Sequence, residues 1–162
     1  MEVNGWRLFQ HPLFEDQFDR LLADAERVLA KEPEGFQNHR TVKLLLRITQ
    51  LISEEIPADP ADDRYNQGNT LGKDYRHWKR AKFGRYRLFF RYARKTKKHG
   101  KAIVYAWVND ENTLRKEGDK SDPYAIFARG LQRGQPPDCF EELLKQAKEL
   151  NKLQSKKFDE PK

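Results

Sequence analysis

Cationic and apolar residues alternate between positions 82 and 92 of this 162-residue sequence. If this stretch is a β-strand, side chains two residues apart share a face. Arg85, Arg87 and Arg91 would then line one face, and the opposite face would be apolar. An arginine guanidinium binds phosphate oxygens through paired hydrogen bonds. The pattern therefore predicts a strand that packs through one face and binds RNA or another polyphosphate through the other.

The positive charge of the chain is concentrated around this stretch. Residues 73–101 contain thirteen lysines and arginines and a single acidic residue, Asp74. The whole chain has a net charge of +7, so the remainder is net negative. A local cationic surface with interleaved aromatic rings is typical of nucleic-acid binding. The alternative is a solvated basic hairpin with an aromatic core side.

Other kinds of site find little support in the sequence. The four histidines, His11, His39, His77 and His99, lack the spacing of metal ligands, and no glycine-rich phosphate loop is present. One cysteine, Cys139, allows no internal disulfide and fits a reducing cytoplasm. The sequence contains no stretch of about 18 apolar residues, so no membrane span is expected. The N-terminus also lacks an apolar signal core. We therefore expect no metal, no other cofactor and no membrane association.

The remaining sequence predicts the elements that hold the cationic strand. Apolar residues at three- and four-residue spacing indicate one helix over 14–29 and a second over 34–55, separated by Pro33. A short lead-in or edge strand is expected over 3–9. The three main strands are expected over 77–83, 85–95 and 101–109. The last of these is apolar on both faces, which favours a central position in the sheet.

Two further helices are expected after the strands. Asp122-Pro123 opens a short helix that runs to Leu131, and an amphipathic stripe follows over 140–153. Because helices and strands are segregated along the chain, the expected class is α+β. We expect an N-terminal helix pair packed on a small antiparallel sheet, with short C-terminal helices. Residues 1–154 would form one domain and 155–162 a flexible tail.

Several longer segments of the sequence resemble a known family. They are the segments at 4–6, 11–12, 78–84, 85–92, 107–115, 124–127, 133–134 and 136–137. Over residues 3–137 the chain resembles YhaV-type toxins of the RelE/ParE superfamily. The resemblance implies a RelE-like fold and the toxin of a bacterial type II toxin–antitoxin system. It also implies a cytoplasmic endoribonuclease that cuts mRNA, with dependence on the ribosome.

The same resemblance implies partners. The expected antitoxin is PrlF-like, with a DNA-binding domain of the AbrB/MazE type. Operator DNA would be bound only by the toxin–antitoxin complex, which would repress its own operon.

Metal-independent RNA cleavage assigns roles to the cationic strands. The 2′-hydroxyl attacks the adjacent phosphate, so the protein must align the backbone, move protons and stabilise phosphoryl charge. Arg85 and Arg87 are our candidates for the charge, and Lys82 is our candidate for proton transfer. Further RNA contacts are expected from three neighbours, Lys79, Arg80 and Arg91.

Three residues after the last strand complete the candidate site. Asn109 could bind a base or ribose, and the resemblance places substrate contacts at Arg115 and Tyr124, with Tyr124 counted as catalytic. Each has a structural alternative, in which Asn109 forms a turn, Arg115 pairs with Asp110 or Glu111, and Tyr124 only packs at the start of its helix.

Two other functions remain open at the level of the sequence. A non-catalytic RNA- or ribosome-binding module would use the same cations only to hold phosphates. An inhibitor of DNA gyrase related to ParE would share the fold without the ribonuclease chemistry.

Overall fold

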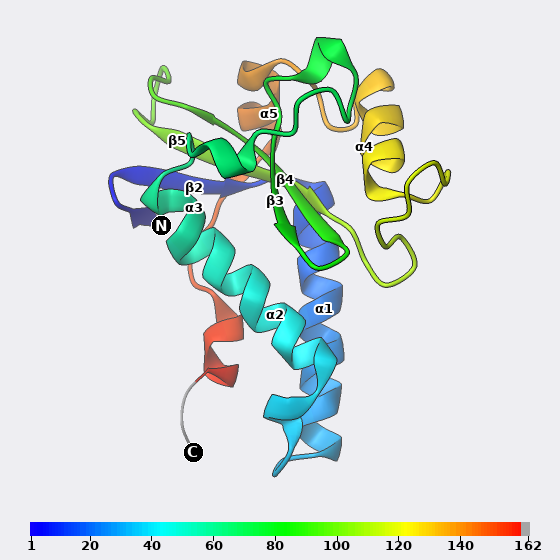
Figure 1. Cartoon of the computed structure of the whole chain (residues 1–162). Helices are drawn as coiled ribbons and strands as arrows, with labels where there is room; N and C mark the ends of the chain where they lie inside the picture. The colour runs from blue at the N-terminus through cyan, green and yellow to red at the C-terminus, as the bar shows by residue number, and fades with distance from the viewer. Residues whose placement is uncertain (160–162) are drawn as a thin grey trace.

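A six-stranded mixed sheet forms the centre of the fold, and both ends of the chain contribute strands to it (Figure 1). The computed structural model describes residues 1–159. The strands are β1 (Glu2–Val3), β2 (Trp6–Gln10), β3 (Lys79–Phe83), β4 (Tyr86–Ala93), β5 (Ala102–Val108) and β6 (Lys148–Glu149). Their order is β1-β2-β5-β4-β3, and β6 also pairs with β2. The α+β class predicted from the sequence is confirmed.

The predicted antiparallel sheet is wrong in one respect, because β2 and β5 are parallel. Arg7 pairs with Ala102 and Gln10 pairs with Tyr105. A parallel pair needs a long crossover connection, and the first two helices lie within it. The segment expected as a lead-in or edge strand is therefore an interior strand, with β5 on one side and the short β1 and β6 on the other. The central position predicted for β5 is confirmed, between β2 and β4.

Histidines begin both long helices of the first part of the chain. Helix α1 (Pro12–Lys31) starts where Nδ1 of His11 accepts a 3.2 Å hydrogen bond from the Leu13 amide. Helix α2 (Arg40–Gln50) starts in the same way at His39. It continues through a π-helical turn, Leu51–Glu55, into α3 (Ile56–Ala58). These caps satisfy amide groups that a helix start leaves unpaired. The second helix begins later than expected, because Phe36–Asn38 form a separate 3-10 turn.

The two faces of the sheet carry separate cores. Helices α1 and α2 pack on one face, around Leu45, Leu88, Phe90 and Tyr105. On the other face lie α4 (Pro123–Gln132) and α5 (Phe140–Gln146) (Figure 1). The core there is largely aromatic: the ring of Phe89 stacks on that of Phe127 with centroids 4.3 Å apart. The predicted alternation along β4 is confirmed, but both faces of the strand pack against a core, whereas the sequence pattern predicts one packed face and one RNA-binding face.

The C-terminal part of the chain differs from the expected long amphipathic helix. Helix α5 ends at Gln146, and β6 follows it along the open edge of β2. The Leu150 amide then donates to the Leu8 carbonyl at 2.8 Å. Unpaired backbone groups on a strand edge attract such pairing, which sequence periodicity does not reveal. Leu150 and Leu153 still reach the α1–α2 core.

Packed structure also extends beyond the boundary expected at residue 154. Gln154–Phe158 form a 3-10 helix in which Ser155 and Phe158 are buried. The Ser155 hydroxyl lies 2.6 Å from that of Thr49 on α2. Residues 160–162 of the predicted tail lie outside the described residues. Among the described residues, no helix combines the length and apolarity that crossing a membrane requires.

Candidate active site

The phenol of Tyr124 is the meeting point of two strand arginines. Its oxygen accepts a 2.8 Å hydrogen bond from Nε of Arg80 on β3 and a 3.1 Å bond from Nε of Arg87 on β4. Tyr124 itself lies in the first turn of α4, packed against the ring of Phe89. With both arginines donating to its oxygen, the hydroxyl proton has no acceptor within residues 1–159. One phenol therefore joins β3, β4 and α4.

Arg115 joins this group from the loop after β5. Its guanidinium carbon lies 4.9 Å from the centroid of the Tyr124 ring, a distance at which a cation is attracted to the ring face. Nη1 of Arg115 donates to Oδ1 of Asp122 at 2.6 Å, and this hydrogen bond raises the pKa of the Arg115 guanidinium. We call Arg80, Arg87, Arg115, Asp122 and Tyr124 the tyrosine cluster. Three guanidiniums and one carboxylate leave it positively charged.

Asp122 is the member of the cluster that the sequence reasoning missed as a site residue. Its carboxylate is buried and accepts from the amides of Lys116 and Tyr124 as well as from Arg115. The Asp-Pro pair signals a helix start, and Asp122 does cap α4. The hydrogen bond to the loop is a tertiary contact for which the sequence carries no signal.

Arg85 and Asn109 hold the loop that carries Arg115. The Asn109 amide nitrogen donates to the carbonyls of Thr113 and Arg85, and its oxygen accepts from the Arg87 amide at 2.7 Å. Nε of Arg85 donates to the Arg115 carbonyl at 3.0 Å, while the Arg115 amide donates back to the Arg85 carbonyl. The buried Asn109 side chain therefore makes these hydrogen bonds within the protein. Asn109 stabilises a turn, which is the structural alternative to binding a base or ribose.

The predicted open row of Arg85, Arg87 and Arg91 does not form. Arg85 precedes β4 and lies in the turn, because the strand begins at Tyr86. Arg91 shares the face of Arg87, but the start of α5 covers it: its guanidinium lies 5.4 Å from the Phe140 ring and donates to the Asp138 carbonyl. Burial lowers the pKa of Arg91. The tertiary cover, which the strand pattern could not show, separates Arg91 from the tyrosine cluster.

The two candidate lysines of β3 lie on opposite faces of the sheet. Lys82 is exposed, pairs in register with Arg87 and shares the face of Arg80, so it lies beside the tyrosine cluster. It has no ion pair or hydrogen bond within the described part of the chain. Lys79 faces the other way and donates to Oδ1 of Asn66 at 2.6 Å. The structure therefore brings Lys82, but not Lys79, to the cluster.

The structure also bears on two other kinds of site, a histidine general base and a metal centre. Nε2 of His77 lies 2.6 Å from Oδ1 of Asp138, which also accepts from the Trp78 indole, beside Arg91 rather than Tyr124. Within residues 1–159, no group of three or more histidine, cysteine, aspartate or glutamate side chains is arranged to hold a metal ion.

Residues 8–148 match the model of a family described as "Toxin with endonuclease activity, of toxin-antitoxin system". The chain belongs to this family, the YhaV toxins. It is 42% identical to "Ribonuclease toxin YhaV" of Escherichia coli (strain K12) over 152 residues, 92% of this chain and 96% of the relative. The same identity and coverage hold for "Toxin YhaV" of Escherichia coli O157:H7. No solved structure matches the chain significantly.

YhaV membership confirms the resemblance read from the sequence and the enzyme class, an endonuclease toxin. The matched residues 8–148 contain the whole tyrosine cluster and Lys82. Membership in a toxin–antitoxin family also implies an antitoxin as partner. The family description names no residues, so the roles within the YhaV site have to be argued from its geometry.

Proposed function

We propose that this chain is an endoribonuclease that cuts mRNA at the tyrosine cluster, without a metal, by attack of a 2′-hydroxyl on the adjacent phosphate. The observation that carries the proposal is the Tyr124 phenol, whose oxygen accepts from Arg80 and Arg87. These bonds occupy the lone pairs of the phenol oxygen, so its hydroxyl proton remains available to a substrate oxygen. The name of the Escherichia coli relative, a ribonuclease toxin, supports RNA as the target.

The guanidinium groups stabilise the negative charge that develops on the phosphoryl group. As the 2′-oxygen bonds to phosphorus, negative charge accumulates on the non-bridging oxygens. Fixed donors stabilise this charge without reorganising. Arg115 is half-exposed and has donors beyond the one bonded to Asp122. Nη2 of Arg87 has no acceptor in residues 1–159, and exposed Arg85 lies at the rim, so both can contribute further donors to the phosphate.

The two proton transfers fall to Lys82 and Tyr124. Lys82, in its neutral form, accepts the proton of the attacking 2′-hydroxyl. Tyr124 donates its proton to the 5′-oxygen as the bond from phosphorus to that oxygen breaks. The products are a 2′,3′-cyclic phosphate and a 5′-hydroxyl. Resetting requires one proton to pass from Lys82 to solvent and one to return to Tyr124.

The finer features expected from the family resemblance belong to the same proposal. The antiparallel β3–β4–β5 sheet after two helices is consistent with a RelE-like arrangement. We propose a PrlF-like antitoxin of the AbrB/MazE type, ribosome-dependent cutting in the bacterial cytoplasm, and operator binding only through the toxin–antitoxin complex. Co-expression with the neighbouring operon gene, followed by co-purification and operator gel shifts, tests these partners.

The decisive experiment is end-mapping of RNA treated with the purified protein, with and without ribosomes. We expect new 5′-hydroxyl ends paired with 2′,3′-cyclic phosphates, formed equally well in excess EDTA when ribosomes are left out. An RNA with a single 2′-deoxy nucleotide at the mapped position should stay intact there. Products that end in a 3′-hydroxyl, or cutting of free RNA that EDTA abolishes, would refute the proposed chemistry.

A further inference from the structure

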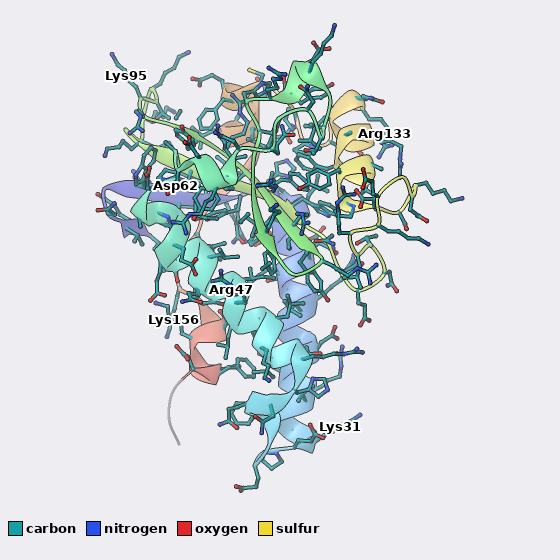
Figure 2. All side chains as sticks on the ribbon, viewed as in Figure 1. Lys31, Arg47, Asp62, Lys95, Arg133 and Lys156 are labelled. Carbon is teal, nitrogen blue, oxygen red and sulfur yellow. The ribbon has the colours of Figure 1, made fainter. Side chains whose placement is uncertain are left out.

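A second cationic surface lies at the end of the sheet far from the tyrosine cluster. It is the tip of the β4–β5 hairpin, where five cations are exposed: Arg94, Lys95, Lys97, Lys98 and Lys101. We call these residues the hairpin cations. Figure 2 shows Lys95 at this tip, on the opposite side of the molecule from Arg133 at the end of α4. None of the hairpin cations forms an ion pair with an acid in residues 1–159.

Aromatic rings hold the two outer cations in place. The guanidinium of Arg94 lies 5.7 Å from the centroid of the Trp6 ring and 5.9 Å from that of Tyr92. Nζ of Lys101 lies 5.2 Å from the same Trp6 ring. Trp6 and Tyr92 meet edge to face, with centroids 5.6 Å apart. The base of the tip is therefore supported by buried or half-buried aromatic rings.

The turn between these cations is also braced. The hydroxyl of Thr96 donates to the Gly100 carbonyl at 2.9 Å and accepts from the His99 amide at 3.0 Å. The His99 ring packs on that of Phe9, with centroids 5.0 Å apart. The fold thus holds five like charges close together in a fixed hairpin. Such repulsion costs free energy, and no carboxylate in residues 1–159 offsets it through an ion pair.

We propose that the hairpin cations form an anchor for the RNA phosphate backbone, separate from the site of cutting. Lysines bind phosphate as point charges and read no sequence. Arg87 lies on β4 and Arg94 directly follows the end of this strand, seven residues later, which corresponds to about 23 Å. One RNA could therefore lie at the tyrosine cluster and on the hairpin at once. The inference rests on the proposed function in one respect, that RNA is the substrate.

The test removes three charges that no aromatic ring holds. The triple variant Lys95→Gln, Lys97→Gln, Lys98→Gln is made in a Tyr124→Phe background, so that RNA is bound but not cut. Its affinity for a single-stranded RNA is measured over a range of salt concentrations. At ~0.1 M salt we expect at least ~10-fold weaker binding, and a salt dependence that is shallower by about 2 in log–log slope, because three phosphate contacts are lost.

A matched triple variant controls for net charge. Lys31→Gln, Lys43→Gln, Lys145→Gln removes the same charge from exposed positions on α1, α2 and α5. We expect its affinity for RNA to stay within about 2-fold, since long-range effects of single charges are screened at this salt. Equal losses in the two triple variants would overturn the anchor. Unchanged RNA binding with lost neutralisation by the antitoxin would also overturn it, by assigning the surface to that partner.

Cleavage distinguishes failure of the anchor from failure of the proposed function. With Tyr124 intact, the hairpin variant should show a raised KM for RNA and an unchanged kcat. If the unmodified protein cuts no RNA while the hairpin triple still weakens binding, the proposed function fails and the anchor stands. If the protein cuts RNA and the hairpin triple alters neither affinity nor KM, the anchor fails alone.

Discussion

Nη1 of Arg115 and Oδ1 of Asp122 lie 2.6 Å apart, and this ion pair joins the loop after β5 to the start of α4. The carboxylate is buried and the guanidinium lies over the Tyr124 ring. Since Asp122 also caps the helix that carries Tyr124, one side chain positions two of the groups that we place around the scissile phosphate. The geometry of the candidate site therefore depends on a residue that does not touch the substrate.

Replacement of Asp122 by Asn should show how much its negative charge contributes to activity, apart from its role as the cap of α4. Asn retains one oxygen that can cap α4, so we expect Asp122→Asn to stay folded, with a melting temperature lowered only by the amide group that replaces the second acceptor oxygen. It loses the ionic bond to Arg115, and we expect kcat for RNA cleavage to fall at least ~10-fold, the effect of about 1.4 kcal/mol in the barrier. Asp59→Asn, whose side chain accepts from the Ala61 amide in an exposed turn, is the control and should leave kcat unchanged. A loss of melting temperature that accounts for all lost activity would contradict a positioning role.

The Tyr124 hydroxyl should matter far more than the rest of its ring. Tyr124→Phe keeps the packing against Phe89 but removes the proton donor. We expect kcat to fall by about 10²-fold or more, as for loss of a general acid, with the same fold by circular dichroism. Tyr75→Phe, at the edge of the same aromatic core, is the matched control. Comparable cleavage rates for both variants would remove Tyr124 from the mechanism.

Protonation of His11 should weaken the fold in mild acid. Its Nδ1 accepts from the Leu13 amide, Nε2 bonds to Gln146 at 2.8 Å, and burial lowers the pKa of His11 below its usual 6.5. Between these two pKa values the unfolded chain binds more protons, so the free energy of unfolding rises with pH. This contribution is present above the unfolded pKa and is lost as the pH falls through the folded one.

Urea unfolding at several pH values between about 5 and 7.5 measures this effect of His11. His11→Asn retains a capping side chain and should flatten the dependence in this range. His77→Gln changes a half-exposed histidine outside any helix and serves as the control. If His11→Asn leaves the slope of stability with pH unaltered, the buried cap is not its origin.

The C-terminal 3-10 helix should contribute to stability. Phe158 is buried in the α1–α2 core, with its ring 6.2 Å from that of Phe36. We expect Phe158→Ala to lower the free energy of unfolding by about 3 kcal/mol, in the range for a buried phenylalanine. Lys157→Ala removes an exposed ion pair to Glu26 and should cost less than about 1 kcal/mol. Equal, small effects in urea unfolding would show that this segment is not part of the packed domain.

Local sequence patterns were enough for the main elements of the fold and for the family. The three- and four-residue apolar spacing predicts α1, the Asp-Pro pair predicts α4, and apolar residues on both faces predict the central place of β5. These signals are local, because helix faces, caps and strand alternation depend on neighbours along the chain. The cationic strands and the family motifs likewise directed attention to Arg80, Lys82, Arg87, Arg115 and Tyr124.

Long-range packing decided the rest. The parallel pairing of β2 with β5, the return of the chain along β2 as β6 and the burial of Phe158 all join residues far apart in sequence. So do the two hydrogen bonds that converge on Tyr124. The same packing separates Arg91 from Arg87 on one strand, since α5 covers only one of them. Alternation along a strand specifies which side chains share a face, but only the elements packed on that face decide which of them meet a substrate.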